Sequence, residues 1–290
     1  MTAHARLPGS AGASVAASAA DGAGSIGAEA VGAPAKLELR GVTKSYGFGG
    51  GTLDVLRNVS LTVEDKRFVS VVGPSGSGKS TLFYIVGGLT APTSGSVWLD
   101  GRDVTGERGL ISYMPQQDSL LPWRTIVGNV ALSQELAGTP KAEARARATE
   151  WLGRVGLAGY ERALPHQLSG GMRQRASFLR ALLSPGELMC LDEPFGALDA
   201  LTRHEMQRWL LRIWEETRRS VLFVTHSIEE ALLLSDRIYV LAGKPASVAD
   251  TIEVPFGRPR DESVAADPAF QALKKRIYET LRAGAGEERR

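Results

Sequence analysis

Apolar and polar residues alternate along several short stretches in the first hundred residues. The alternation covers 37–39 and 59–63, and 95–101 follows a similar pattern before a turn. A period of two is typical of strands that bury one face and expose the other. We therefore predict a layer of antiparallel strands in this part of the chain.

Three further runs, 68–72, 188–191 and 221–224, contain almost no polar residues. Continuous apolar runs of this length are typical of strands buried on both faces, as in a parallel sheet covered by helices. The pattern therefore predicts an α/β fold in which a parallel core sheet lies beside the antiparallel layer.

Helical patterns dominate 123–183, where 142–155 forms one amphipathic stretch, and we expect a separate helical subdomain there. A second helix is predicted at about 267–282, because apolar residues recur there at helical spacing. These residues are Phe270, Leu273, Ile277 and Leu281. Their apolar face can pack either on the core or on a partner molecule.

Composition narrows the class of protein. The 290 residues carry a net charge of +2, which does not favour a nucleic-acid groove. No apolar run approaches the roughly 20 residues of a bilayer-spanning helix. The single cysteine, Cys190, lies in a predicted core strand, so an internal disulfide is excluded and a reducing compartment fits. Residues 1–35 are dominated by Ala, Gly and Ser, and we expect a disordered tail.

The strongest chemical signal follows the first core strand. It reads Gly73-Pro74-Ser75-Gly76-Ser77-Gly78-Lys79-Ser80-Thr81 and leads into a helical segment. Glycines let backbone N–H groups approach phosphates closely, and the N-terminus of the helix adds its positive end. Lys79 suits the β- and γ-phosphates, and the Ser80 hydroxyl suits Mg²⁺. The sequence therefore predicts a nucleoside triphosphate site.

Ionisable residues follow the other two core strands: Asp192 and Glu193 come after the second, and His226 comes after the third. An acidic residue at the end of a core strand suits the oxygen shell of Mg²⁺, so we predict that Asp192 binds the metal directly or through water. Glu193 is suited to act as a general base beside a bound nucleotide. A purely structural role at the strand ends is the alternative.

Two more motifs complete the set: Leu168-Ser169-Gly170-Gly171-Met172 precedes the second core strand, and Gly196-Ala197-Leu198-Asp199 follows it. In this order the motifs resemble the ATP-binding cassette (ABC) family over roughly residues 37–241. The resemblance implies the P-loop NTPase fold of an ABC cassette, with an ATPase domain at 36–245 and a C-terminal extension at 246–290. Within the domain, the helical subdomain would occupy about 123–183.

The resemblance also implies roles for single residues. Glu193 would polarise the attacking water, His226 would contact the γ-phosphate, and Gln116 would sense Mg²⁺ and the water. Tyr46 would stack on adenine. Stacking does not recognise the edge of the base, so GTP remains a second substrate. For Tyr46 the alternative is an ordinary surface tyrosine, and Gln117 beside Gln116 is the rival glutamine.

The segment Ser169, Gly170 and Gly171 opens a helix whose free N–H groups form a second anion site. The resemblance implies that this site closes on ATP held by another cassette, either a second copy of the chain or a paralogue. Asp199 would lie in the dimer-contact loop. Met172 stands where the family usually has Gln, which puts a side-chain contact to the nucleotide in doubt.

Four runs, 120–123, 165–172, 195–203 and 258–261, look like the importer group for nitrate, sulfonates, taurine and thiamine precursors. The resemblance implies an ATP-hydrolysing subunit at the cytoplasmic face of the membrane, with permease subunits and a solute-binding protein as partners. The alternatives are an exporter or lipid-extraction cassette, and an ABC ATPase that acts on DNA or ribosomes.

The first of these runs, Leu120-Leu121-Pro122-Trp123, has two interpretations of its own. It either fills the core or forms part of an exposed patch that docks a membrane subunit.

Overall fold

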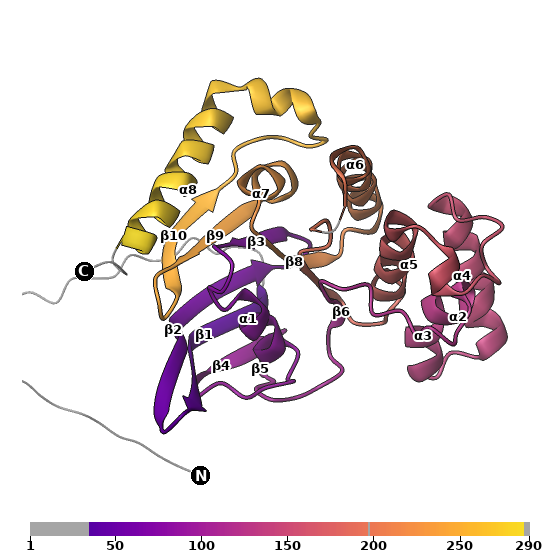
Figure 1. Ribbon diagram of the computed structural model, residues 1–290, viewed down its shortest axis with the longest axis horizontal. Helices are drawn as coiled ribbons and strands as arrows, with labels where there is room; N and C mark the ends of the chain where they lie inside the picture. The colour runs from indigo at the N-terminus through magenta and orange to yellow at the C-terminus, as the bar shows by residue number, and fades with distance from the viewer. Residues whose placement is uncertain (1–34, 197, 287–290) are drawn as a thin grey trace, which may run out of the picture. The chain divides into compact units, whose positions relative to one another are not determined.

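The computed structural model describes residues 35–196 and 198–286 (Figure 1). The tail predicted for 1–35 therefore lies outside the described residues, apart from Ala35. The chain folds into two β-sheets with helices between and around them.

The first sheet is the antiparallel layer. It contains β1 (Ala35–Phe48), β2 (Gly51–Glu64), β4 (Ser94–Leu99) and β5 (Arg102–Asp103) in the order β2-β1-β4-β5. All three neighbouring pairs are antiparallel. The residues that alternate in the sequence bury one face of this sheet, as Leu37 and Leu39 do in β1. The predicted antiparallel layer is confirmed.

The second sheet is the core sheet, with the order β10-β9-β3-β8-β7-β6. Its strands are β3 (Phe68–Val72), β6 (Ser112–Met114), β7 (Leu188–Asp192), β8 (Ser220–Thr225), β9 (Arg237–Ala242) and β10 (Ser247–Glu253). All pairs are parallel except β9 with β10. The three apolar runs form β3, β8 and β7, which are adjacent and fully buried. Their carboxyl ends therefore lie at one edge of the sheet, where open α/β sheets bind ligands.

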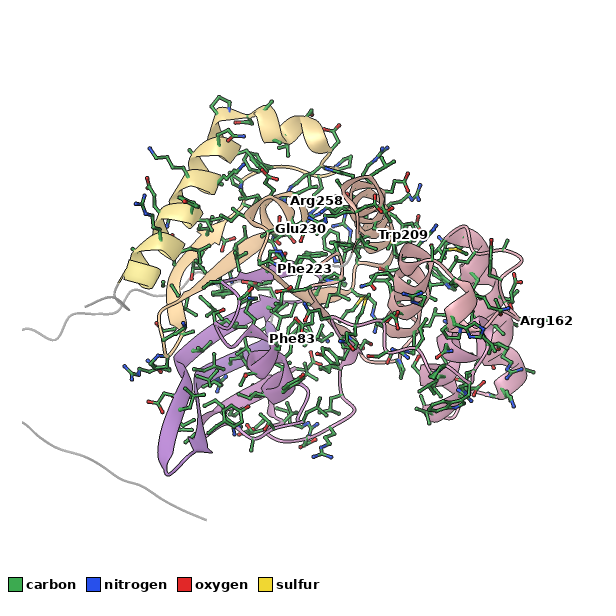
Figure 2. All side chains as sticks on the ribbon, in the orientation of Figure 1. Phe83, Arg162, Trp209, Phe223, Glu230 and Arg258 are labelled. Carbon is green, nitrogen blue, oxygen red and sulfur yellow. The ribbon has the colours of Figure 1, made fainter. Side chains whose placement is uncertain are left out.

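Side chains of the core strands point alternately to the two faces of the sheet, where they join two large hydrophobic clusters and a smaller one that includes Ile238 and Val240 of β9. Val69 and Val71 pack with Phe83 of α1 (Lys79–Val86) and with the antiparallel layer. Phe68 and Phe223 pack on the other face, with α5 (Gly170–Leu182) and α6 (Ala200–Thr217). Phe83 and Phe223 mark the two large clusters in Figure 2. Because α1 lies between the sheets, the segment that precedes it is held from both sides.

The helix-rich segment contains α2 (Ile126–Val130), α3 (Leu132–Leu136), α4 (Lys141–Arg154), η1 (Pro165–Gln167) and α5. These helices gather at the right of Figure 1. Ala144, Ala148 and Leu152 form the buried face of α4 and pack against the cluster that includes α5. The helix that begins at Gly170 therefore connects this group of helices to the core sheet.

The C-terminal extension contains η2 (Glu262–Ala266) and α8 (Pro268–Gly286). Phe270 and Ile277 are buried against α7 (Ile228–Leu234), β9 and β10, so the predicted apolar face packs on the core. Arg258 accompanies this packing: it donates to Leu234 O at the end of α7, and its Nη2 lies 2.9 Å from Asp236 Oδ1 (Figure 2). No described helix is both long and apolar enough to cross a membrane.

Candidate functional site

The phosphate-loop segment, Gly73–Thr81, joins β3 to α1. Gly78 caps α1 with φ 82°, and no side chain bonds to the free N–H groups of the first turn. A Cβ on Gly78 would lie 2.8 Å from Val55 Cγ1, and one on Gly73 would lie 2.6 Å from Ser77 Oγ. The glycines therefore let the backbone pack where a side chain would clash. The uncapped N–H groups at the start of α1 are donors that suit phosphate.

Lys79 lies across this segment. Its Nζ donates to Gly73 O and Pro74 O, both at 2.9 Å, and its side chain is only 6% exposed. Burial lowers the pKa of Lys79, and the carboxylates of Glu193 and Asp192 oppose this shift. Ser77 Oγ is also buried and has no protein partner among the described residues. A buried ammonium and a free buried hydroxyl beside the glycine cradle both fit an anionic ligand.

The carboxylate of Glu193 is the point where the predicted catalytic residues meet. Gln116 Nε2 donates to Glu193 Oε2 at 3.2 Å, and His226 Nδ1 lies 3.1 Å from the same oxygen. Lys79 Nζ lies 3.7 Å from the other oxygen, Oε1. The backbone of Glu193 has φ 44°, a left-handed conformation that is uncommon for non-glycine residues. The fold thus brings four separate segments together.

Asp192, the predicted metal ligand, precedes Glu193 and lies next to this cluster. Its side chain accepts hydrogen bonds from Ser80 and from Tyr113, the latter at 3.4 Å. Burial raises the pKa of Asp192, and Glu193 adds to this shift, whereas the bonds from Ser80 and Tyr113 and the nearby Lys79 oppose it. The donors near the phosphate loop are a hydroxyl, a carboxylate and the amide of Gln116. Hard oxygen donors of this kind are the ligands that Mg²⁺ prefers, so the residues fit a magnesium–nucleotide complex.

The other predicted residues lie apart from this cluster in the described contacts. Ser169 caps α5 by accepting from Met172 N at 3.4 Å, and Asp199 caps α6 by accepting from Thr202 N at 3.1 Å. Tyr46 lies on β1, where its ring is stacked under Lys44 Nζ at 4.7 Å. No hydrogen bond or ion pair between described residues joins Ser169–Gly171, Asp199 or Tyr46 to the phosphate loop.

Several residues that shape the site were not predicted. Tyr113 holds Asp192, and Gln174 donates to Pro194 O at 2.5 Å, behind Glu193. Arg173 donates to Asp118 Oδ2 at 2.8 Å, and Arg180 donates to Ser119 O at 2.8 Å. These two arginines tie the loop after Gln116 to α5. Their spacing of seven residues on one helix was the available signal.

In the run at 120–123, one residue fits the core-filling interpretation and another fits the interpretation as an exposed patch. Leu120 is buried, whereas Trp123 is 74% exposed. The fully buried Asn129 holds this loop: its Oδ1 accepts from Leu121 N at 2.7 Å and its Nδ2 donates to Leu121 O at 3.1 Å. The loop therefore anchors one apolar side chain in the core and presents another to solvent.

Comparison with known proteins agrees with this geometry. A family model described as "ABC transporter" matches residues 56–196. The formylaminopyrimidine import ATP-binding protein ThiZ of Halalkalibacterium halodurans is 47% identical over 229 residues, which cover 78% of this chain and 90% of ThiZ. The chain belongs to the ABC transporter family. The taurine import ATP-binding protein TauB of Pseudomonas putida is 39% identical over 251 residues, or 84% of this cassette and 94% of TauB.

A solved structure gives the same result for the fold. The ATP-binding cassette MJ0796, a dimer in a post-hydrolysis state bound to ADP and Pi, has a TM-score of 0.67 and 33% identity. The match covers 76% of this cassette and 100% of MJ0796. The α/β ABC cassette fold expected from the sequence is confirmed, as is membership of a family of ATP-hydrolysing transporter subunits.

Proposed function

We propose that this cassette hydrolyses ATP to drive a membrane importer of a small solute. The single observation that carries the chemistry is the convergence of Lys79, Gln116 and His226 on the carboxylate of Glu193. The names of ThiZ and TauB, both import ATP-binding proteins, favour import over export or a role away from membranes. The solute is proposed to belong to the nitrate, sulfonate, taurine or thiamine-precursor type.

The positions of the side chains support a proposed role for each of them in the reaction. Lys79 would bind the β- and γ-phosphates, and Ser80, Asp192 and Gln116 would hold Mg²⁺, which would neutralise phosphate charge. Glu193 takes a proton from the water that attacks the γ-phosphorus, while the bond to the β–γ bridging oxygen breaks. ADP and inorganic phosphate leave.

The carboxylate of Glu193 is prepared for this role by its neighbours. Gln116 and His226 both bond with Oε2 when His226 carries a proton on Nδ1, and these two bonds orient the carboxylate. For His226 also to contact the γ-phosphate, its other ring nitrogen, Nε2, would have to carry a proton as well, because phosphate oxygens only accept hydrogen bonds. A base held by two side chains loses little freedom when the water binds.

The complete site is proposed to form between two cassettes. Ser169, Gly170 and Gly171 at the start of α5 would bind ATP held by a second copy or a paralogue, and Tyr46 would stack on adenine. Asp199 would contact the partner at the start of α6. Among the described residues of one chain, no hydrogen bond or ion pair joins Ser169–Gly171 or Asp199 to the phosphate loop, and this supports the proposal, as does the dimeric state of MJ0796.

The proposed partners beyond the cassette are two permease subunits, with an extracytoplasmic solute-binding protein. Trp123 would be part of the surface that docks a permease at the cytoplasmic face of the membrane. The exposure of this indole, beside a loop fixed by Asn129, supports that role.

Affinity capture of the complex tests this function. The Glu193→Gln cassette, with ATP added to hold the dimer, is purified from native membranes and its partners are identified by mass spectrometry. Recovery of a multi-span permease with a solute-binding protein would support an importer and identify its cargo. Recovery of a permease alone would favour an exporter, and ribosomal or DNA-bound proteins would contradict transport while leaving the ATPase chemistry intact.

A further inference from the structure

Glu230 is a buried carboxylate that the proposed reaction does not use. It lies on α7, is 7% exposed, and is surrounded by α6, α7 and the end of β8 (Figure 2). Thr225 Oγ1 donates to Glu230 Oε2 at 2.6 Å, and Gln207 Nε2 donates to Glu230 Oε1 at 3.1 Å. Arg203 Nε lies 3.9 Å from Oε1. Burying a carboxylate is costly, so a structure keeps one there only when several partners satisfy it.

The bond from Thr225 connects Glu230 to the loop that contains His226. Thr225 immediately precedes His226, and Ser227 immediately follows it. Ser227 N donates to Thr225 Oγ1 at 3.0 Å, and Ser227 Oγ accepts from Glu230 N at 3.3 Å. Glu230 therefore contacts both neighbours of His226, one through its side chain and the other through its backbone.

The contacts with Gln207 and Arg203 connect Glu230 to α6. Arg203 and Gln207 are four residues apart, so they lie on the same face of this helix. Gln207 is itself only 5% exposed. Helix α6 begins at its cap residue, Asp199. One carboxylate thus joins the first turns of α6 to the loop that presents His226 to Glu193.

We propose that Glu230 is a positioning residue for ATP hydrolysis, which holds the loop of His226 at a fixed place relative to α6. The proposal rests on the proposed role of His226. It follows that a movement of α6 at the Asp199 end shifts His226, because Gln207 and Thr225 bond to the two oxygens of one rigid carboxylate. The bond between His226 and Glu193 would then depend on where α6 lies.

Steady-state ATP hydrolysis by the full-length cassette tests this role. In Glu230→Gln, one carboxylate oxygen becomes an NH₂ group, so the side chain cannot accept from both Thr225 and Gln207. We expect kcat to fall about tenfold or more, as for other small misplacements of catalytic groups, with KM for ATP changed less than about twofold. Thr225→Val should have the same effect, whereas Thr225→Ser, which keeps the hydroxyl, should restore most of kcat.

Glu229→Gln is the matched control, because Glu229 is the exposed neighbour and pairs with Lys274 at 2.5 Å on the surface. Glu229→Gln should leave both kcat and KM for ATP unchanged. The combined variant His226→Ala with Glu230→Gln should be no slower than His226→Ala alone, because Glu230 acts through His226. A merely structural role would instead make the two losses multiply.

The outcomes separate this inference from the proposed function. If His226→Ala is inactive and Glu230→Gln keeps the wild-type kcat, only the positioning role is overturned. A loss in Glu230→Gln that multiplies with His226→Ala, or that Thr225→Ser shares, would overturn it equally. If His226→Ala itself keeps the wild-type kcat, the proposed role of His226 fails and the inference fails with it.

Discussion

At the scale of single residues, the proposed chemistry depends most on Glu193. Glu193→Gln should bind ATP normally and accumulate an ATP-bound dimer, because the amide keeps the size of the carboxylate but cannot accept the proton of water. We expect the hydrolysis rate to fall about 10²- to 10⁴-fold, the usual contribution of a general base. Phosphate release and size-exclusion chromatography with ATP measure the two effects. Wild-type turnover would contradict the assignment of Glu193.

Asp199 allows a prediction of pH dependence at the same scale. Hydrogen bonds from Thr202 lower the pKa of Asp199 below its usual range. A carboxylate with a lowered pKa in the folded state stabilises that state above its unfolded pKa of about 4, and this contribution is lost as the pH falls through the folded value. Asp199→Asn keeps an N-cap that does not titrate. The difference in unfolding free energy between the two proteins should be constant at neutral pH and change only below about pH 4. A difference that changes near pH 7 would contradict this account.

The sequence predicts single residues best where each follows a core strand. Glu193 and His226 were predicted in this way, and Lys79 was predicted from the glycine motif after the first core strand. The structure brings the three side chains together, because the carboxyl ends of adjacent parallel strands meet at one edge of the sheet. The partners of these residues were harder to predict. Tyr113 bonds to Asp192 from another strand, and Gln207 of α6 bonds to Glu230 of α7. These contacts form through packing between different elements, and no local pattern encodes them. The same reason explains why Gln174 was missed.

At the scale of elements, periodicity predicted helices and strands. It did not predict which residues of the loop at 120–123 are buried and which are exposed. The apolar residues of that loop are consecutive, so period alone cannot assign one to the core and another to solvent. The buried amide of Asn129 determines which residue is buried, because its hydrogen bonds fix the backbone of that loop. Sequence patterns describe the regular elements, whereas the shape of a loop depends on such single polar contacts.

The exposed indole in this loop gives a prediction about assembly. Trp123→Ala should leave ATP binding and the stability of the isolated cassette unchanged, because the side chain is 74% exposed. It should weaken association with the permease at least tenfold if the indole is a buried anchor of that interface, since such anchors contribute about 2 kcal/mol or more. Co-purification of the transporter measures the effect. Leu136→Ala, at a residue that is 80% exposed on α3, is the control. If both variants lose the same amount of permease on co-purification, Trp123 has no specific role in docking.

At the scale of the whole molecule, the C-terminal extension reaches the phosphate loop indirectly. Residue Leu241 of β9 lies against Gly73, where a Cβ would be 3.1 Å from Leu241 O. The turn after β9 bonds to β2, with Ala246 N donating to Val55 O at 3.0 Å, and Val55 lies against Gly78. Both ends of the phosphate loop therefore rest on residues connected to this one turn.

Helix α8 packs on the same turn through Gly284. A Cβ at Gly284 would lie 2.5 Å from Ala242 Cβ and 3.1 Å from Gly243 N, so any side chain there must displace the helix or the turn. Overpacking of this kind usually costs about 1–3 kcal/mol. We expect Gly284→Val to lower the unfolding free energy by about this amount and to raise KM for ATP, because the displaced turn supports the glycines of the phosphate loop. Gly153→Val is the matched control, since Gly153 is also helical and a Cβ there meets nothing within 4 Å. If Gly284→Val lowers stability but binds ATP like the control, the turn supports the fold without supporting the nucleotide site.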